Sequence, residues 1–178
     1  MPTSNLEVIE PIMRFVMDIN PRSILDIGIG FGKYGFLCRE YLETLKNRSP
    51  CFSAWKARID GVEVFTDYIS PHHWLIYNHI YKVDIERHLE IIANPVRDLY
   101  IMTDVLEHFD NWSDVLRAIP LESALVVSTP NGEYPQGERF GNVYEKHRAT
   151  FSVDVLSATG LFTSVEVVKD TILALRKS

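Results

Sequence analysis

The sequence has 178 residues, of which 46% are hydrophobic and 24% are charged, and its net charge is −6. This length allows one domain with a substantial core and is short for two, so we expect a single domain over residues 1–178. No Lys/Arg-rich run and no basic patch stands out, which disfavours nucleic acids and anionic membranes as partners.

The N-terminal segment does not resemble a signal peptide, because charged residues interrupt its apolar run and no basic stretch precedes it. No window approaches the roughly 18 apolar residues of a membrane span. The two cysteines, Cys38 and Cys51, cannot form a metal site alone. We therefore expect a cytoplasmic protein with reduced thiols.

Residues 4–19 carry apolar side chains at helical spacing, which predicts an amphipathic helix. Pro11 either kinks this helix or marks the start of its regular part. Further along, short apolar runs alternate with helical patterns. The predicted strands are 23–27, 58–65, 80–84, 98–104 and 123–129, and the predicted helices are 34–45, 70–78, 111–119 and 152–160.

The chain closes with two adjacent β-rich runs, 164–170 and 171–177, which predict a hairpin around Asp170. Five alternations of strand and helix are typical of a parallel sheet covered on both faces. We therefore expect an α/β, three-layer, Rossmann-like sandwich. Its seven-stranded, mostly parallel sheet would have one antiparallel edge strand, and a ligand would bind at the carboxyl ends of the strands.

The turn after the first strand contains four glycines. They are Gly28, Gly30, Gly32 and Gly35. A phosphate-binding P-loop is excluded, because the spacing is one residue short and Tyr34 follows Lys33 where Ser or Thr is needed. The last three glycines match the dinucleotide pattern G-x-G-x-x-G. That register, however, would bury the Asp26 carboxylate inside a central strand at a cost of several kcal/mol.

A third pattern, h-h-D-h-G-x-G-x-G, fits Asp26 followed by Gly28, Gly30 and Gly32. It places the acid at the end of the strand, where it faces a cationic ligand, and the glycines let the backbone approach that ligand closely. This stretch closely resembles the first glycine motif of class I S-adenosylmethionine-dependent methyltransferases. The resemblance implies that S-adenosylmethionine is the cofactor.

The resemblance also implies cofactor contacts at the ends of the next strands. Glu63 would hold the ribose hydroxyls, and Asp84 would hold the adenine amino group. The further candidates are Lys33 for the methionine carboxylate, Tyr34 for the sulfonium, Val64 and Ile85 for the adenine faces, and Asp104. The alternatives are a solvated strand end for Glu63 and a helix cap for Asp84.

The segment after the fourth strand carries the pattern D-x-x-E-H in Asp104, Glu107 and His108, which resembles a bacterial, small-molecule branch of these enzymes. His108 is the first candidate for a general base because its ordinary pKa lies near neutrality, and His147 is the second. Alternatively, Glu107 and His108 cap the next helix or pair with Arg148.

Residues 130–148 form a long polar stretch without periodicity, and loops of this length in compact domains are usually functional or disordered. We expect this loop and the N-terminal helix (1–20) to form the pocket for a small-molecule or sugar-precursor acceptor. The alternatives are a non-catalytic cofactor-binding or partner-subunit protein and, less favoured, an NAD-dependent oxidoreductase. No metal site is expected, since no cysteine or acid completes a ligand set around His72, His73 and His79. The chain could form homo-oligomers.

Overall fold

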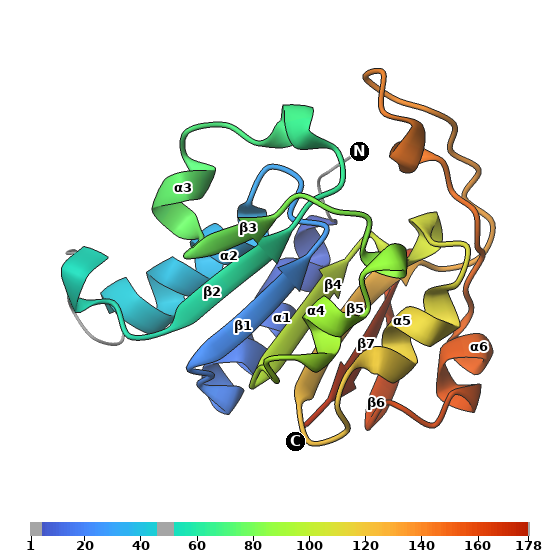
Figure 1. Cartoon of the computed structure of the whole chain (residues 1–178). Coiled ribbons are helices and arrows are strands. Elements are labelled where there is room, and N and C mark those ends of the chain that lie inside the picture. The colour runs from blue at the N-terminus through green and yellow to red at the C-terminus, as the bar shows by residue number, and fades with distance from the viewer. Residues whose placement is uncertain (1–4, 46–51, 178) are drawn as a thin grey trace.

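The computed structural model describes residues 5–45 and 52–177. The polar stretch 46–57 is described only in its second half, because residues 46–51, including Cys51, lie outside the described residues. Seven strands form one sheet in the order β3-β2-β1-β4-β5-β7-β6 (Figure 1). The strands are β1 (Ser23–Ile27), β2 (Arg58–Val62), β3 (His79–Tyr81), β4 (Leu99–Thr103), β5 (Ala124–Pro130), β6 (Ser164–Val168) and β7 (Thr171–Arg176).

The sheet is mostly parallel, as predicted. Strands β1 to β5 pair in parallel, whereas β7 pairs antiparallel with both β5 and β6. The predicted hairpin around Asp170 is therefore confirmed. The antiparallel strand is β7, which lies next to the edge of the sheet and not at the edge itself. The edge strand is β6.

Helices cover both faces of the sheet (Figure 1). One face packs against α1 (Ile9–Ile19) and α2 (Lys33–Cys38), and the other against α4 (Glu90–Ala93), α5 (Trp112–Ala118) and α6 (Val153–Ala158). Neighbouring strand residues divide between the two cores, because successive side chains of a strand point to opposite faces. Ile24 belongs to the first core and Leu25 to the second. The three-layer sandwich is thus confirmed.

The predicted helix 34–45 is shorter than expected. Helix α2 ends at Cys38, and a π-helical turn follows at Arg39–Leu45. Arg39 is buried there, and its guanidinium donates hydrogen bonds to the backbone carbonyls of Ile76 and Ala57. These tertiary contacts occur where the helix widens into the π-helical turn. No local sequence pattern predicts them.

Other boundaries also move. The predicted helix 70–78 shrinks to α3 (His73–Ile76), and β2 ends at Val62, before the expected residue 65. Pro11 lies in the first turn of α1, where its missing N–H costs no hydrogen bond, so it marks the start of the helix. Within the described residues no helix is long and apolar enough to cross a membrane.

Candidate functional site

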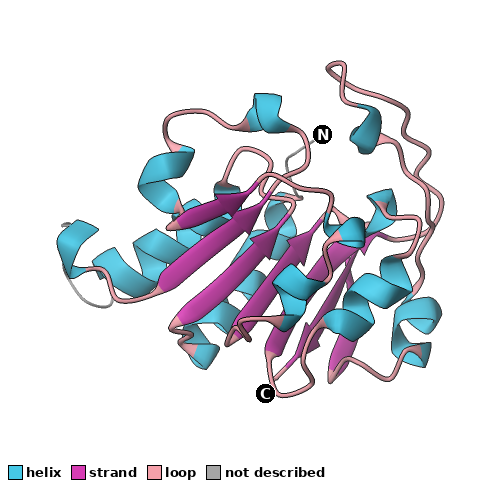
Figure 2. Ribbon diagram, viewed as in Figure 1, coloured by secondary structure: helices cyan, strands magenta, loops and turns pink. Residues whose placement is uncertain are grey.

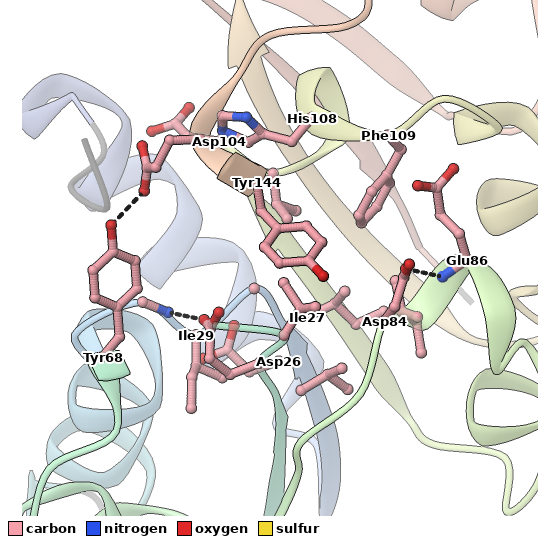
Figure 3. Close-up of a pocket in the computed structure, with 18 of the residues that line it drawn as sticks. Asp26, Ile27, Ile29, Tyr68, Asp84, Glu86, Asp104, His108, Phe109 and Tyr144 are labelled. Atoms are coloured by element: carbon pink, nitrogen blue, oxygen red, sulfur yellow. Dashed lines mark hydrogen bonds between the residues drawn. The ribbon is translucent and has the colours of Figure 1, made fainter. Parts of the chain in front are cut away.

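The carboxyl ends of β1 to β4 border a pocket of about 270 Å³, which we call the strand-end pocket (Figure 3). Among the residues that line it are all of the predicted cofactor contacts except Gly32. They are Asp26, Gly28, Gly30, Lys33, Tyr34, Glu63, Val64, Asp84, Ile85 and Asp104. The pocket lies at the switch point between β1 and β4, where open α/β sheets bind their ligands.

The backbone conformation and packing of the glycine turn explain why two of its positions are glycine. Gly28 has a φ of 76°, and a Cβ at this position would lie 2.5 Å from Val105, so a side chain is excluded. Gly32, with a φ of 81°, caps α2 and packs against His73 and Ile76. Gly32 does not line the strand-end pocket, and its cofactor contact stays a prediction.

Asp26 lies within β1, one residue before the end of the strand, close to the predicted position at the strand end. Its side chain is 3% exposed, and Oδ2 accepts a 2.7 Å hydrogen bond from the Tyr77 hydroxyl. Burial raises the pKa of Asp26 to about 6, although the Tyr77 hydrogen bond opposes the shift. The prediction that this strand would not bury a carboxylate was therefore wrong, because the Tyr77 hydroxyl supplies a hydrogen-bond partner.

Glu63 follows β2 directly and is 6% exposed. Its Oε2 accepts a hydrogen bond from the backbone N–H of Gly30 at 3.0 Å, and its Oε1 accepts one from Phe65 at 2.8 Å. Burial raises the pKa of Glu63 to about 7 despite these donors. The carboxylate therefore fastens the glycine turn to the end of β2 and lies on the pocket wall, so it is more than a solvated strand end.

Asp84 caps the short 3₁₀ turn Ile85–Arg87, and its Oδ1 accepts a hydrogen bond from the backbone N–H of Glu86 at 3.1 Å. The capping alternative is thus correct, and Asp84 lines the strand-end pocket as well. Beside it, Ile85 is buried in the core and reaches the same wall. Val64 supplies a second apolar contact at the end of β2.

Asp104 directly follows β4 and has a φ of 50°. A positive φ is uncommon for a residue with a side chain and is often found at functional sites. The Ser128 hydroxyl donates a 3.3 Å hydrogen bond to its Oδ1. This backbone conformation puts Asp104 on the wall of two pockets at once.

The second pocket, of about 370 Å³, is the loop pocket. Asp104 and His108 line it and also line the strand-end pocket. Its other lining residues are Asn5, Glu7, Glu107, Pro130, Tyr134, Gln136, Arg139, His147, Lys169, Asp170 and Thr171. The predicted acceptor loop therefore does border a pocket. Its N-terminal partner is the segment just before α1 rather than the helix.

Three predicted catalytic residues converge on the loop pocket. Glu107 and His108 belong to the 3₁₀ turn Leu106–His108, and His147 comes from the far end of the loop. One potential ligand atom from each lies within 4.8 Å of the others. Glu107 is 2% exposed, and burial together with the Asp104 charge raises its pKa to about 8. Such a set can exchange protons or hold a cation.

Both histidines are held by backbone carbonyls. Nδ1 of His108 lies 3.2 Å from the carbonyl oxygen of Lys146, and Nδ1 of His147 contacts that of Tyr134. Their rings are 4.9 Å apart, edge to face. Burial lowers the pKa of His108 to about 4 and also lowers that of His147, so both rings are neutral at pH 7.

The loop 130–148 also closes the strand-end pocket, a contribution that the sequence did not predict residue by residue. Figure 2 shows it running over the carboxyl edge of the sheet with one short helical turn, Val143–Glu145. The Tyr68 hydroxyl donates a 2.9 Å hydrogen bond to Glu145 and so ties the loop to the opposite rim. Tyr144 reaches into the pocket from this turn (Figure 3). Its aromatic character, in a loop rich in aromatics, is the one signal that could have indicated this contact.

Comparison with known proteins gives structural neighbours only, since no family model and no curated protein matches the sequence. A SAM-dependent methyltransferase from Archaeoglobus fulgidus is 15% identical with a TM-score of 0.62, and the alignment covers 97% of this chain and 95% of that one. The N-terminal domain of EvdMO1 with SAH bound is 12% identical with a TM-score of 0.60, over 93% and 78% of the two chains.

An O-methyltransferase family protein from Burkholderia thailandensis is 13% identical with a TM-score of 0.59; the match covers 96% of this chain and 57% of that protein's length. The 16S rRNA methylase RmtB is also similar, at 15% identity and a TM-score of 0.52, so the fold alone does not select the acceptor. At these identities the likeness shows architecture, and the D-x-x-E-H branch stays a prediction. The chain has the fold of the class I S-adenosylmethionine-dependent methyltransferases.

Proposed function

We propose that the protein is an S-adenosylmethionine-dependent methyltransferase that acts on a small-molecule acceptor. The observation that carries this proposal is the meeting of two pockets at Asp104 and His108. Methyl transfer needs little covalent help and depends on holding the nucleophile, the methyl carbon and the sulfur in line. Two adjoining pockets, one for each reactant, satisfy that requirement.

The strand-end pocket has the chemistry that this cofactor requires. S-adenosylmethionine would supply a methyl group on a positively charged sulfur. Glu63 offers carboxylate oxygens to the ribose hydroxyls, and Asp84 offers one to the adenine amino group. Val64 and Ile85 give the adenine apolar contacts, and the Asp26 carboxylate favours the cationic amino group. Lys33 and Tyr34 complete the proposed set, at the methionine carboxylate and the sulfonium.

The acceptor would occupy the loop pocket, whose volume and mixed charges suit a polar small molecule such as a sugar precursor. The net charge of −6 supports this choice over nucleic acid, because phosphate backbones attract basic surfaces. A nucleophile that carries a proton must lose it. His108 is the first candidate to accept that proton and His147 the second, but a pKa of about 4 makes His108 a weak base.

A thermal-shift comparison tests the cofactor. We expect S-adenosylhomocysteine to raise the melting temperature and NAD to leave it unchanged. Stabilisation by NAD alone would favour the oxidoreductase alternative and contradict the proposal. Consumption of S-adenosylmethionine over a panel of hydroxylated small molecules and sugar nucleotides then tests catalysis. Cofactor binding without turnover on any acceptor would favour the non-catalytic or partner-subunit alternative.

A further inference from the structure

Glu107, His108 and His147 are brought together by contacts of the backbone as well as of the side chains. The backbone N–H groups of Arg148 and Ala149 donate hydrogen bonds of 2.8 and 3.1 Å to the carbonyl oxygen of Glu107. The end of the loop is thus fastened to the turn that carries Glu107 and His108. The 4.8 Å limit among the three ligand atoms follows from this connection. Ligand atoms this close to one another can coordinate a single ion.

The hydrogen bonds of the two rings determine which nitrogen each presents. A backbone carbonyl can only accept a hydrogen bond, so Nδ1 of His108 must donate to Lys146, and Nδ1 of His147 must donate to Tyr134. In each neutral ring the proton is then on Nδ1, and Nε2 carries a free lone pair. Histidines that bind metals are oriented in this way, with the other ring N–H donated to a carbonyl or a carboxylate.

The carboxyl group of Glu107 is buried beside that of Asp104 and forms no ion pair with a Lys, Arg or His side chain among residues 5–45 and 52–177. The Thr129 hydroxyl donates a 2.9 Å hydrogen bond to its Oε2, which orients the group without neutralising it. A buried carboxylate is costly unless an opposite charge pairs with it. A cation at this position would compensate it, and the oriented oxygen would serve as a ligand.

We propose that Glu107, His108 and His147 bind one divalent cation through a carboxylate oxygen and two Nε2 atoms. Two imidazoles and one carboxylate suit Mn²⁺, Fe²⁺, Co²⁺ or Zn²⁺, and three protein ligands leave coordination positions open. Because all three residues line the loop pocket, the open positions face the proposed acceptor. His108 and Asp104 place the ion at the junction with the strand-end pocket.

The role of the ion rests on the proposed function. A bound divalent cation lowers the pKa of a coordinated hydroxyl, so the acceptor class is a molecule with an alcohol or a phenol group. The O–H bond of the acceptor breaks, and its proton passes to water in the loop pocket. The oxygen then forms a bond to the methyl carbon as the carbon–sulfur bond breaks, with the electron pair remaining on sulfur. With the ion bound, His108 is a ligand, and the proton goes to water instead of to His108, the first candidate base in the absence of an ion.

Direct metal binding tests the site without reference to activity. The full chain is stripped with a chelator and titrated with Mn²⁺ by calorimetry, and with Co²⁺ by visible absorption. We expect one equivalent to bind, with Co²⁺ bands typical of mixed nitrogen and oxygen ligands. Glu107→Gln and His147→Ala should each weaken Mn²⁺ binding by at least about tenfold. His79→Ala, which removes an exposed histidine from β3, is the matched control and should bind Mn²⁺ like the unaltered chain.

Binding of S-adenosylhomocysteine, measured on the same samples, verifies that each variant is folded and separates the two proposals. Absence of stoichiometric Mn²⁺ and Co²⁺ binding in a chain that binds S-adenosylhomocysteine overturns the metal site and leaves the proposed function intact. Equal Mn²⁺ affinity in the His147→Ala and unaltered chains also overturns it. Metal binding that depends on these residues in a chain without affinity for S-adenosylhomocysteine supports the site and contradicts the proposed function.

Discussion

The two pockets are built in different ways. The strand-end pocket is formed mainly by residues within or just beyond β1 to β4, each held by the hydrogen bonds of a central parallel sheet. The loop pocket draws its wall from the segment before α1, the loop 130–148 and the β6–β7 turn. The carboxyl edge of a parallel sheet has a regular geometry that can bind a ligand common to many enzymes. A loop can vary in sequence without disturbing that sheet, and it therefore suits the reactant that differs between enzymes.

We expect the largest effect from a substitution in the wall of the strand-end pocket, at Gly28. Gly28→Ala must place a Cβ 2.5 Å from Val105 at a φ of 76°, so we expect a loss of about 2–4 kcal/mol in the free energy of unfolding. Gly137→Ala in the loop is the matched control, because its Cβ would meet nothing within 4 Å. Chemical denaturation measures both. Equal effects would mean that the two regions do not differ in rigidity.

Glu63→Ala removes the proposed hydrogen-bond acceptor for the ribose hydroxyls, together with the hydrogen bond from the backbone N–H of Gly30. We expect the affinity for S-adenosylhomocysteine, measured by calorimetry, to fall by about 1.5–3 kcal/mol through lost charge-assisted hydrogen bonds. Glu166→Ala on the exposed edge strand β6 is the control and should bind normally. An unchanged affinity in Glu63→Ala would show that the ribose is held elsewhere.

The raised pKa of Glu63 predicts how cofactor binding depends on pH. If the ionised carboxylate accepts the ribose hydroxyls, the affinity for S-adenosylhomocysteine should fall about tenfold between about pH 8 and about pH 6, given a pKa of about 7 in the free protein. Calorimetry across this range measures the effect, and Glu63→Gln should flatten the profile. A profile that stays equally steep in Glu63→Gln would assign the dependence to another group.

The raised pKa of Glu63 also affects stability. Whereas the affinity for S-adenosylhomocysteine should rise with pH, the free energy of unfolding should fall. The folded pKa of Glu63, about 7, lies above its ordinary value of 4.5, and that of Asp26, about 6, lies above 3.8. Between these limits the folded state binds more protons than the unfolded state, so the free energy of unfolding falls as the pH rises. Thermal melts of the ligand-free protein between about pH 4 and about pH 7 check the sign. Added S-adenosylhomocysteine should reduce the slope.

The smallest effect concerns the link between the two regions. Tyr68→Phe removes the hydroxyl that holds Glu145 and leaves the ring contacts with Phe31 and Phe65. We expect a loss of about 1 kcal/mol, the usual worth of one hydrogen bond. Hydrogen exchange should show it as faster exchange in residues 142–146. Faster exchange throughout β1 and β4 instead would mean that the loop and the sheet open as one unit.

The periodic pattern of the chain predicted the order of strands and helices, the three layers and the acids at the ends of successive strands. This was possible because side-chain periodicity is local, and parallel topology brings the carboxyl ends of strands to one edge. Boundaries were less predictable: β2 stops at Val62 and α3 keeps only His73–Ile76. At the end of α3 a tertiary contact contributes, because the Arg39 guanidinium donates a hydrogen bond to the carbonyl of Ile76, the last residue of this helix.

What the sequence by itself determined is therefore the strand-end pocket, since Asp26, Glu63 and Asp84 are placed by their own strands. Only the tertiary structure decided how Asp26 is accommodated, because Tyr77 is its partner from 51 residues away. It also decided that His147 joins Glu107 and His108. No spacing along the chain predicts such a cluster, since the long loop between β5 and α6 must first fold back onto the turn after β4.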